Sequence, residues 1–229
     1  MVTDAHLHLT DPDMDRYSDE VAGCELLFSN TSSPKEFDAL RSLASEDDRI
    51  IPFYGTHPWF LKEYDAQALE SVLISDARAN VGEIGLDTKH GDIEEQMPVF
   101  IEQLDLAQGY DRIVSIHMVG SEEHVLRELR RKRVRSILHS YSSPPGYTEA
   151  FSRCGCFFSI SPRLMNRPAD KIRSILASIP SDRLLIESDS PNGNSMGLQQ
   201  LAESIAGYMG TTCDKIIDIT TDNARRLLM

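Results

Sequence analysis

The sequence predicts an α/β fold, a (β/α)8 barrel of the TIM type formed by one domain over residues 1–229. Eight short apolar, β-branched runs alternate with amphipathic stretches, and this alternation indicates parallel strands joined by crossover helices. Polar residues of metal-ligand type follow these runs, where the strands of a closed barrel converge. The chain of 229 residues is shorter than the about 250 residues usual for such a barrel, so we expect short loops.

The first half of the chain contains four of the expected strands. They are Val2–Leu9, Cys24–Phe28, Ile50–Tyr54 and Val81–Leu86. Proline in Ser32-Ser33-Pro34 predicts a helix start after the second strand, and that helix ends near Asp47. Helical spacing returns over residues 68–73. Gly82 and Gly85 in the fourth strand are expected to let neighbouring groups approach closely.

The second half repeats the alternation. The expected strands are Ile113–Ile116, Ser136–Leu138, Cys156–Ile160 and Leu184–Ile186. Helices are expected over Glu95–Gln108, from Ser121, over Tyr147–Arg153, from Pro168, over Leu198–Met209 and over Asp214–Leu228. A doubly wound open sheet would show the same alternation. The polar residues favour closure, because strands one and eight are neighbours only in a closed barrel.

Composition restricts the environment and the partners. There is no signal-peptide pattern and no apolar run long enough for a membrane span, so we expect a cytoplasmic protein without membrane contact. The four cysteines form no CxxC pair or disulfide framework, which fits a reducing compartment. A formal charge of −13 argues against broad adhesion to nucleic acid but leaves local binding of a strand end open. No obligate protein partner is evident.

Six residues at the expected strand ends have the chemistry of a binuclear metal site. His6 and His8 are two apart on one strand and share a face, and His117 and His139 end strands five and six. Asp189 ends strand eight, and Glu83 lies inside strand four. Imidazoles and carboxylates bind divalent transition metals, and two such ions can hold both the attacking and the leaving oxygen during a hydrolysis. We therefore expect two divalent ions, of zinc, manganese or magnesium.

Motifs along the whole chain resemble those of TatD-type deoxyribonucleases. They are His6-Leu7-His8, Gly55-Thr56-His57-Pro58, the GEIGLD run from Gly82 to Asp87, Ile116-His117, the run from His139 to Ser142, the ESDSP run from Glu187 to Pro191 and the run from Asn223 to Leu227. The GEIGLD and ESDSP runs are the most specific. The resemblance implies an amidohydrolase-like barrel that hydrolyses phosphodiesters with divalent metals, often as a 3′ exonuclease on single-stranded DNA.

The resemblance also implies residue roles. His6, His8, Glu83 and Asp189 would hold one ion, and Glu83, His117 and His139 would hold the other. A water between the ions would be the nucleophile, and Asp189 could orient it or accept its proton. Asp189 and Glu83 are therefore the expected catalytic residues.

Substrate contacts are expected at two further positions. His57 follows strand three and precedes Trp59 and Phe60, which offer aromatic surface, so it is either a substrate contact or a loop anchor. Arg163, after the seventh strand, could bind a phosphate or could be an exposed loop residue. His90 and His124 are expected to be plain surface residues.

The chain departs from the family pattern at three places around the expected mouth. The arginine usual two residues after His117 is absent, Ser140 and Tyr141 replace the usual cysteine and phenylalanine, and the loop after Pro191 is short and lacks its basic stretch. Two other functions therefore stay open. A metal-dependent deacylase or amidohydrolase could use the same ligands on an ester or amide, and a non-catalytic barrel could serve as a scaffold.

Overall fold

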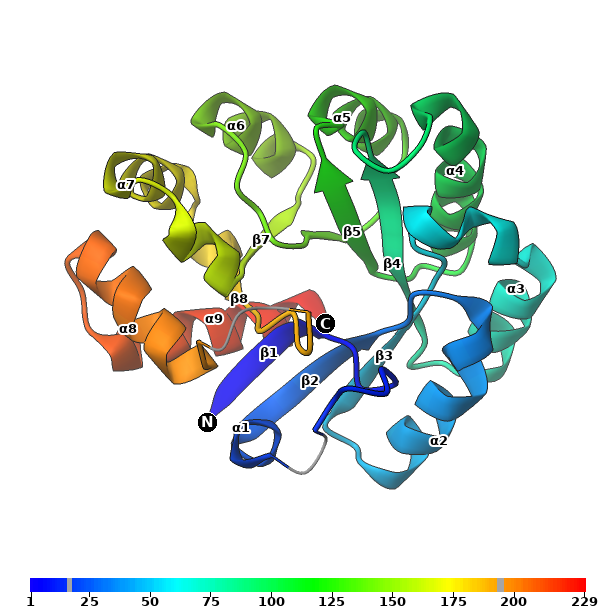
Figure 1. The fold of residues 1–229 in the computed structure, drawn as a ribbon, viewed down its shortest axis with the longest axis horizontal. Helices are drawn as coiled ribbons and strands as arrows, with labels where there is room; N and C mark the ends of the chain where they lie inside the picture. The colour runs from blue at the N-terminus through cyan, green and yellow to red at the C-terminus, as the bar shows by residue number, and fades with distance from the viewer. Residues whose placement is uncertain (16–17, 193–195) are drawn as a thin grey trace. The chain divides into compact units, whose positions relative to one another are not determined.

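Strands and helices alternate regularly along the chain in the computed structural model, which describes residues 1–15, 18–192 and 196–229. Figure 1 follows this alternation by colour from the N-terminus to the C-terminus. The strands are β1 (Val2–Leu7), β2 (Cys24–Asn30), β3 (Ile50–Tyr54), β4 (Asn80–Asp87), β5 (Val114–Val119), β6 (Ser136–Leu138), β7 (Phe157–Ile160) and β8 (Leu184–Ile186). All eight expected strands are confirmed, with ends that differ by three residues at most.

The α-helices other than α1 confirm the expected amphipathic stretches. The α-helices are α1 (Asp19–Ala22), α2 (Phe37–Glu46), α3 (Ala66–Ser75), α4 (Ile93–Gly109), α5 (Glu122–Arg131), α6 (Pro145–Arg153), α7 (Ala169–Ser178), α8 (Leu198–Met209) and α9 (Cys213–Leu227). Side chains cap several of them: Asp65, Asp92 and Thr212 each accept a backbone N–H of the following first turn.

Short helical segments are the part that the sequence did not predict. They are α1 and the 3-10 helices η2 (Pro58–Glu63), η3 (Pro162–Asn166) and η4 (Ser181–Arg183), while η1 (Pro34–Glu36) lies at the expected helix start after Ser33. One or two turns carry too little periodicity to be recognised from a sequence pattern. Two of these segments position residues of the site. His57 is the N-cap of η2, and Arg163 lies within η3.

The chain packs as two compact units, which are described separately. The first unit consists of Met1–Phe28 and His139–Met229, and the second consists of Ser29–Leu138.

The second unit is built on the parallel strands β3, β4, β5 and β6, paired in this order. All eight residues of β4 are buried, as expected for a central parallel strand covered on both faces. Gly85 has a φ of 155°, and a Cβ atom there would lie 1.9 Å from the carbonyl oxygen of His117 on β5. The close approach expected at the glycines of this strand is therefore confirmed.

In the first unit, the first and last strands of the chain are neighbours. β7 pairs with β8 in parallel, and the backbone beyond β8 hydrogen-bonds to β1. The N–H of Asp189 donates to the carbonyl of His6 at 3.0 Å, and the N–H of His8 donates to the carbonyl of Ser190 at 2.8 Å. An open doubly wound sheet would not normally join these strands. The order of elements and this junction are those of the TIM-type (β/α)8 fold.

The C-terminal helix α9 covers the junction of β1 and β8, so that the red helix lies beside the blue strand in Figure 1. Asn223, from the closing motif, donates its amide to the carbonyls of Ser181 and Leu184, each at 2.8 Å. This buried side chain ties α9 to the start of β8.

Arg127, Arg130 and Arg131 are exposed side chains of α5. Cys24, Cys154, Cys156 and Cys213 are free thiols. Within the described ranges, no helix is both long and apolar enough to cross a membrane.

Candidate metal centre

The six expected ligands and His57 are described here within the unit to which each belongs. The first cluster consists of His6, His8, His139 and Asp189, and the second consists of His57, Glu83 and His117. Within each cluster, three residues offer ligand atoms that lie within 4.8 Å of one another: His6, His8 and Asp189 in the first, and all three members in the second.

The first cluster joins residues at the carboxyl ends of β1 and β8 with His139 of the same unit. His6 is in β1 and His8 just follows it, and their Nε2 atoms are 3.2 Å apart. The ring of His139 stacks on that of His6 with a centroid distance of 3.7 Å. Oδ1 of Asp189 is 3.9 Å from Nε2 of His8 and 4.0 Å from Nε2 of His139. Three imidazoles and one carboxylate, all buried, thus point toward one another.

Asp189 is held in an unusual backbone conformation. Its φ is 56°, in the left-handed region that non-glycine residues rarely adopt. Arg163 binds the outer oxygen, Oδ2, through Nε at 3.1 Å and Nη2 at 3.0 Å, and Nη2 also donates to the carbonyl of Asn192. These contacts fix the carboxylate with Oδ1 toward the histidines. Strain of this kind persists where the surroundings over-determine it, typically at functional sites.

Two further buried carboxylates support the first cluster. Oε1 of Glu187 is 2.8 Å from Nδ1 of His139 and accepts the N–H of Ser140 at 2.8 Å. Burial alone would raise the pKa of Glu187, yet the nearby His139 and His6 imidazoles hold it below its usual value. Oδ1 of Asp4 accepts the N–H groups of His6 and Ser188, and burial raises the pKa of this carboxyl to about 7.

The second cluster is built on β4, β5 and the start of η2. Oε1 of Glu83 is 2.9 Å from Nδ1 of His117 and 3.5 Å from Nε2 of His57. Gly82 precedes Glu83, and a Cβ atom there would lie 2.6 Å from Oδ1 of Asn30 and 2.8 Å from Cβ of Ser115. Glycine at this position therefore lets β4 bring Glu83 toward the histidines.

Asp87 supports the second cluster in the way that Glu187 supports the first. Its Oδ2 is 3.2 Å from Nε2 of His117 and accepts the indole N–H of Trp59 at 2.9 Å, while its Oδ1 accepts the N–H of Lys89. Burial acts to raise the pKa of Asp87, but the hydrogen bonds from Trp59, Lys89 and His117 lower it overall. A carboxylate behind a ligating histidine fixes its ring and tautomer.

The donor sets of both clusters fit divalent transition metals. Two nitrogens bound to one tetrahedral zinc ion at about 2.0–2.1 Å are about 3.3–3.4 Å apart. The separations of 3.2 Å between His6 and His8 and of 3.5 Å between Glu83 and His57 are close to this value. Mixed imidazole and carboxylate ligation suits zinc or manganese, and the carboxylates also admit magnesium.

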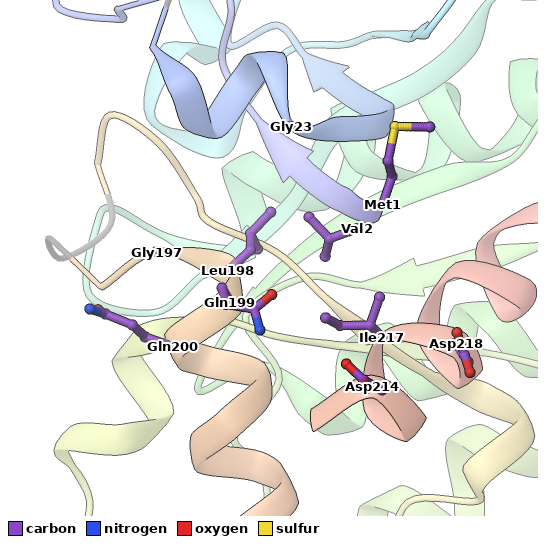
Figure 2. Close-up of a pocket in the computed structure, with 10 residues that line it drawn as sticks. All are labelled: Met1, Val2, Gly23, Gly197, Leu198, Gln199, Gln200, Asp214, Ile217 and Asp218. Carbon is purple, nitrogen blue, oxygen red and sulfur yellow. The ribbon is translucent and has the colours of Figure 1, made fainter. Parts of the chain in front are cut away.

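A groove of about 830 Å³ in the first unit lies elsewhere, at the opposite end of β1. Figure 2 shows Met1 and Val2 on one side of it, with Asp214 and Asp218 of α9 also labelled around it. Val2 and His8 are about 20 Å apart along an extended chain. Among the described residues that line the groove there is no histidine and no member of the first cluster.

Within the first unit, His139 gathers with His6 and Asp189. His57, expected to be a substrate contact or a loop anchor, has its Nε2 atom 3.5 Å from Oε1 of Glu83. Of the short loop after Pro191, residues 193–195 are outside the described part of the chain.

Three residues of the site were not assigned a role in it from sequence. His90, expected to be a plain surface residue, stacks on Trp59 with a centroid distance of 4.1 Å. Asp4 and Glu187 each lie two positions before an expected ligand. A spacing of two places side chains on the same face of a strand, so this signal could have identified Asp4, which lies in β1 with His6. Glu187 and Asp189 both follow the end of β8, where this periodicity does not apply. His90 shows no such spacing, because its contact with Trp59 depends on the path of the loop in the folded protein.

Known proteins resemble the chain over its whole length. The model of the family described as TatD related DNase matches residues 3–229. Human deoxyribonuclease TATDN3 is 26% identical, with 99% of this chain and 94% of the human protein covered. A metal-dependent hydrolase of Escherichia coli K12, YcfH, is 26% identical over 82% of this chain and 77% of its own length.

Solved structures agree with the fold. The crystal structure of YJJV, a TatD homologue from Escherichia coli K12, superposes with a TM-score of 0.87 at 24% identity, covering 99% of this chain and 97% of that one. A TatD family hydrolase from Entamoeba histolytica superposes with a TM-score of 0.83 at 14% identity, with 99% and 97% covered. Both likenesses support the (β/α)8 assignment.

Proposed function

Because the chain belongs to the family of TatD-related DNases, we propose that this metal-dependent hydrolase is a phosphodiesterase that removes nucleotides from the 3′ end of single-stranded DNA. The observation that carries the proposal is the pair of buried ligand clusters, each with a carboxylate behind one of its histidines. The whole chain, residues 1–229, would act as one domain in the cytoplasm.

In this proposal, each cluster holds one divalent ion. His6, His8, His139 and Asp189 hold the first ion, and Glu83, His117 and His57 hold the second. When bound, such ions supply Lewis acidity that lowers the pKa of a water and stabilises negative charge on phosphate oxygens. Glu187 and Asp87 keep the ligating nitrogens of His139 and His117 turned toward the ions.

Asp189 is the proposed proton acceptor. The attacking water forms a bond to phosphorus, its proton passes to the Asp189 carboxylate, and the bond from phosphorus to the 3′ oxygen of the preceding nucleotide breaks. That leaving oxygen takes a proton from solvent. Arg163 steadies Oδ2 of Asp189, which leaves Oδ1 facing the cluster.

Arg163 is also the proposed contact for a substrate phosphate. Its side chain is 56% exposed, although it binds Asp189. A guanidinium has five N–H donors, so a group that holds one carboxylate oxygen can also bind a phosphate oxygen. This arginine would supply positive charge at a mouth that lacks the basic residues usual in the family.

The test is hydrolysis of a 3′-labelled single-stranded oligodeoxynucleotide by protein loaded with manganese or magnesium. We expect metal-dependent release of labelled nucleotide, abolished by EDTA and reduced at least about 100-fold in Asp189→Asn, since proton transfer contributes about 10²–10⁴-fold. Asp218→Asn, an exposed aspartate of α9 in the same unit, is the matched control and should keep the wild-type rate.

Two results would contradict the proposal. Full activity of Asp189→Asn would remove this residue from the mechanism. No release by a protein that binds two ions would exclude the DNA substrate and favour the ester or amide substrate of a deacylase or amidohydrolase. Metal content settles the ion assignment: His8→Ala and His117→Ala should each lose one ion of two.

A further inference from the structure

The aromatic surface beside the second cluster is unusual for its exposure. Within the described ranges, the exposed large apolar side chains are Met1, Trp59, Phe60, Ile74 and Met229. Trp59 and Phe60 are adjacent, and Trp59 is the only tryptophan of the chain, with 51% of its surface exposed. A tryptophan that served only to anchor a loop would be expected to bury most of its ring.

The indole of Trp59 is fixed by hydrogen bonds to the ligand cluster. Its backbone N–H donates to Nδ1 of His57 at 3.2 Å, and its Nε1–H donates to Oδ2 of Asp87 at 2.9 Å. Asp87 in turn contacts His117. The polar edge of the ring therefore faces the second cluster, where Asp87 connects it to the proposed ligand His117. About half of the residue stays open to solvent.

His90 extends this surface. Its ring lies 4.1 Å from that of Trp59 with an interplanar angle of 25°, and its side chain is 55% exposed. Nδ1 of His90 is 3.8 Å from Oδ2 of Asp87, the same carboxylate oxygen that binds the indole. The two rings are thus held face to face as one preorganised stack, which lowers the entropy lost when a flat ligand stacks on its outer face.

We propose that Trp59 and His90 form a stacking subsite for an unpaired base next to the phosphodiester that is cleaved. The proposal rests on the proposed function and specifies its substrate as a DNA end with free base faces. Base stacking on an aromatic ring tolerates any sequence, because every base has a π-face. In a duplex that face is covered by the neighbouring pairs, so a paired end would bind this subsite poorly.

The single tryptophan gives a direct measurement of stacking. Magnesium-loaded wild-type enzyme is titrated with an oligodeoxynucleotide whose last linkages are phosphorothioates that slow cleavage, and tryptophan emission is recorded. We expect quenching by the intact strand, with much less quenching by the same strand lacking its two terminal bases and by a blunt duplex. Equal quenching by the intact and abasic strands would overturn the subsite.

Kinetics with an ordinary oligodeoxynucleotide separate stacking from a structural role. We expect Trp59→Leu to raise KM about 5- to 150-fold, the range that corresponds to about 1–3 kcal/mol per stacked base, with kcat within about threefold. Trp59→Phe keeps a stacking ring but loses the bond to Asp87, so it should restore most of the lost affinity. His90→Ala should raise KM, and His90→Phe should restore it.

The controls distinguish the possible failures. Ile74→Ala removes an exposed apolar side chain of α3 and should leave KM unchanged. If Trp59→Phe were as impaired as Trp59→Leu, the residue would act through Asp87 and the subsite would be rejected. An unchanged KM in Trp59→Leu, with normal wild-type hydrolysis, would reject the subsite alone. No hydrolysis by wild-type enzyme would overturn the proposed function, and the subsite with it.

Discussion

At the scale of single residues, two histidines of the site each have a carboxylate beside the ring nitrogen that faces away from the ligand cluster. Glu187 stands 2.8 Å from Nδ1 of His139, and Asp87 stands 3.2 Å from Nε2 of His117. The opposite nitrogen of each ring faces its ligand cluster. A buried carboxylate without a cationic or metal-linked partner would be strongly unfavourable, so these pairs indicate that the rings are aligned for an ion.

We expect Glu187→Gln to weaken metal binding about 10- to 100-fold, the usual effect of removing such a supporting group. The glutamine can still accept the N–H of Ser140, but it loses the charge beside His139. Competition with a fluorescent chelator measures the affinity directly. Glu149→Gln, which alters an exposed ion pair with Arg153, is the matched control. Unchanged metal affinity in Glu187→Gln would show that His139 does not need this partner.

Membership of the site was predictable from sequence where a residue of metal-ligand type lay at or near the end of an expected strand. His6, His8 and Asp189 were expected together and are found together, because a spacing of two and a strand end fix their direction. The approach of His57 to Glu83 and the stacking of His90 on Trp59 depend on loop paths and on η2. No local pattern encodes those paths.

At the scale of elements, the contact between β4 and β5 positions the second cluster. Gly85 brings its backbone against the carbonyl of His117, in a conformation that other residues rarely adopt. The register between these strands shifts between Val81 and Ile84, next to Glu83. The glycines of β4 predicted a close approach of neighbouring backbone, but nothing in the sequence predicted the shift in register between β4 and β5.

Gly85→Ala is expected to destabilise the protein by at least about 3 kcal/mol, since the added methyl group meets backbone that cannot move aside cheaply. It should also remove one bound ion by displacing His117. Urea unfolding and metal analysis measure the two effects. Gly207 lies on the exposed side of α8 with open space around it. The control variant Gly207→Ala should therefore raise the free energy of unfolding by about 0.5–1 kcal/mol. Similar stabilities for the two variants would contradict the close contact.

Strand positions were the most predictable elements, and short helices the least. The bounds of β3, β6 and β8 agree with those expected, because each is a compact apolar run between polar residues. The 3-10 helix η2 was missed, although it carries Trp59. Its conformation is set by Pro58 and by the cap from His57, which are weak signals in isolation.

At the scale of the whole molecule, net charge opposes the proposed substrate. The chain carries a formal charge of −13, and DNA is a polyanion, so long-range repulsion slows their encounter. Salt screens such repulsion, since the Debye length falls from about 30 Å at 0.01 M to about 10 Å at 0.1 M. A basic nuclease shows the opposite behaviour, because salt weakens its phosphate contacts.

We therefore expect kcat/KM for an oligodeoxynucleotide to rise severalfold between 10 and 100 mM NaCl at constant magnesium. The control is a small chromogenic phosphodiester with one charge, whose hydrolysis should change little. A steady fall of kcat/KM with salt would show that local cationic contacts, such as Arg163, outweigh the overall charge.

The junction of β1 and the end of β8 also sets when the proposed ligands of the first cluster can first come together during synthesis. His6 and His8 are translated before His139 and Asp189, which follow more than a hundred residues later. At about 5–20 residues per second, the ribosome needs roughly 10–35 seconds to go from His8 to Asp189. A nascent or prematurely terminated chain therefore carries only part of the ligand set, and we expect it to be unable to cut DNA until its last strand has been made.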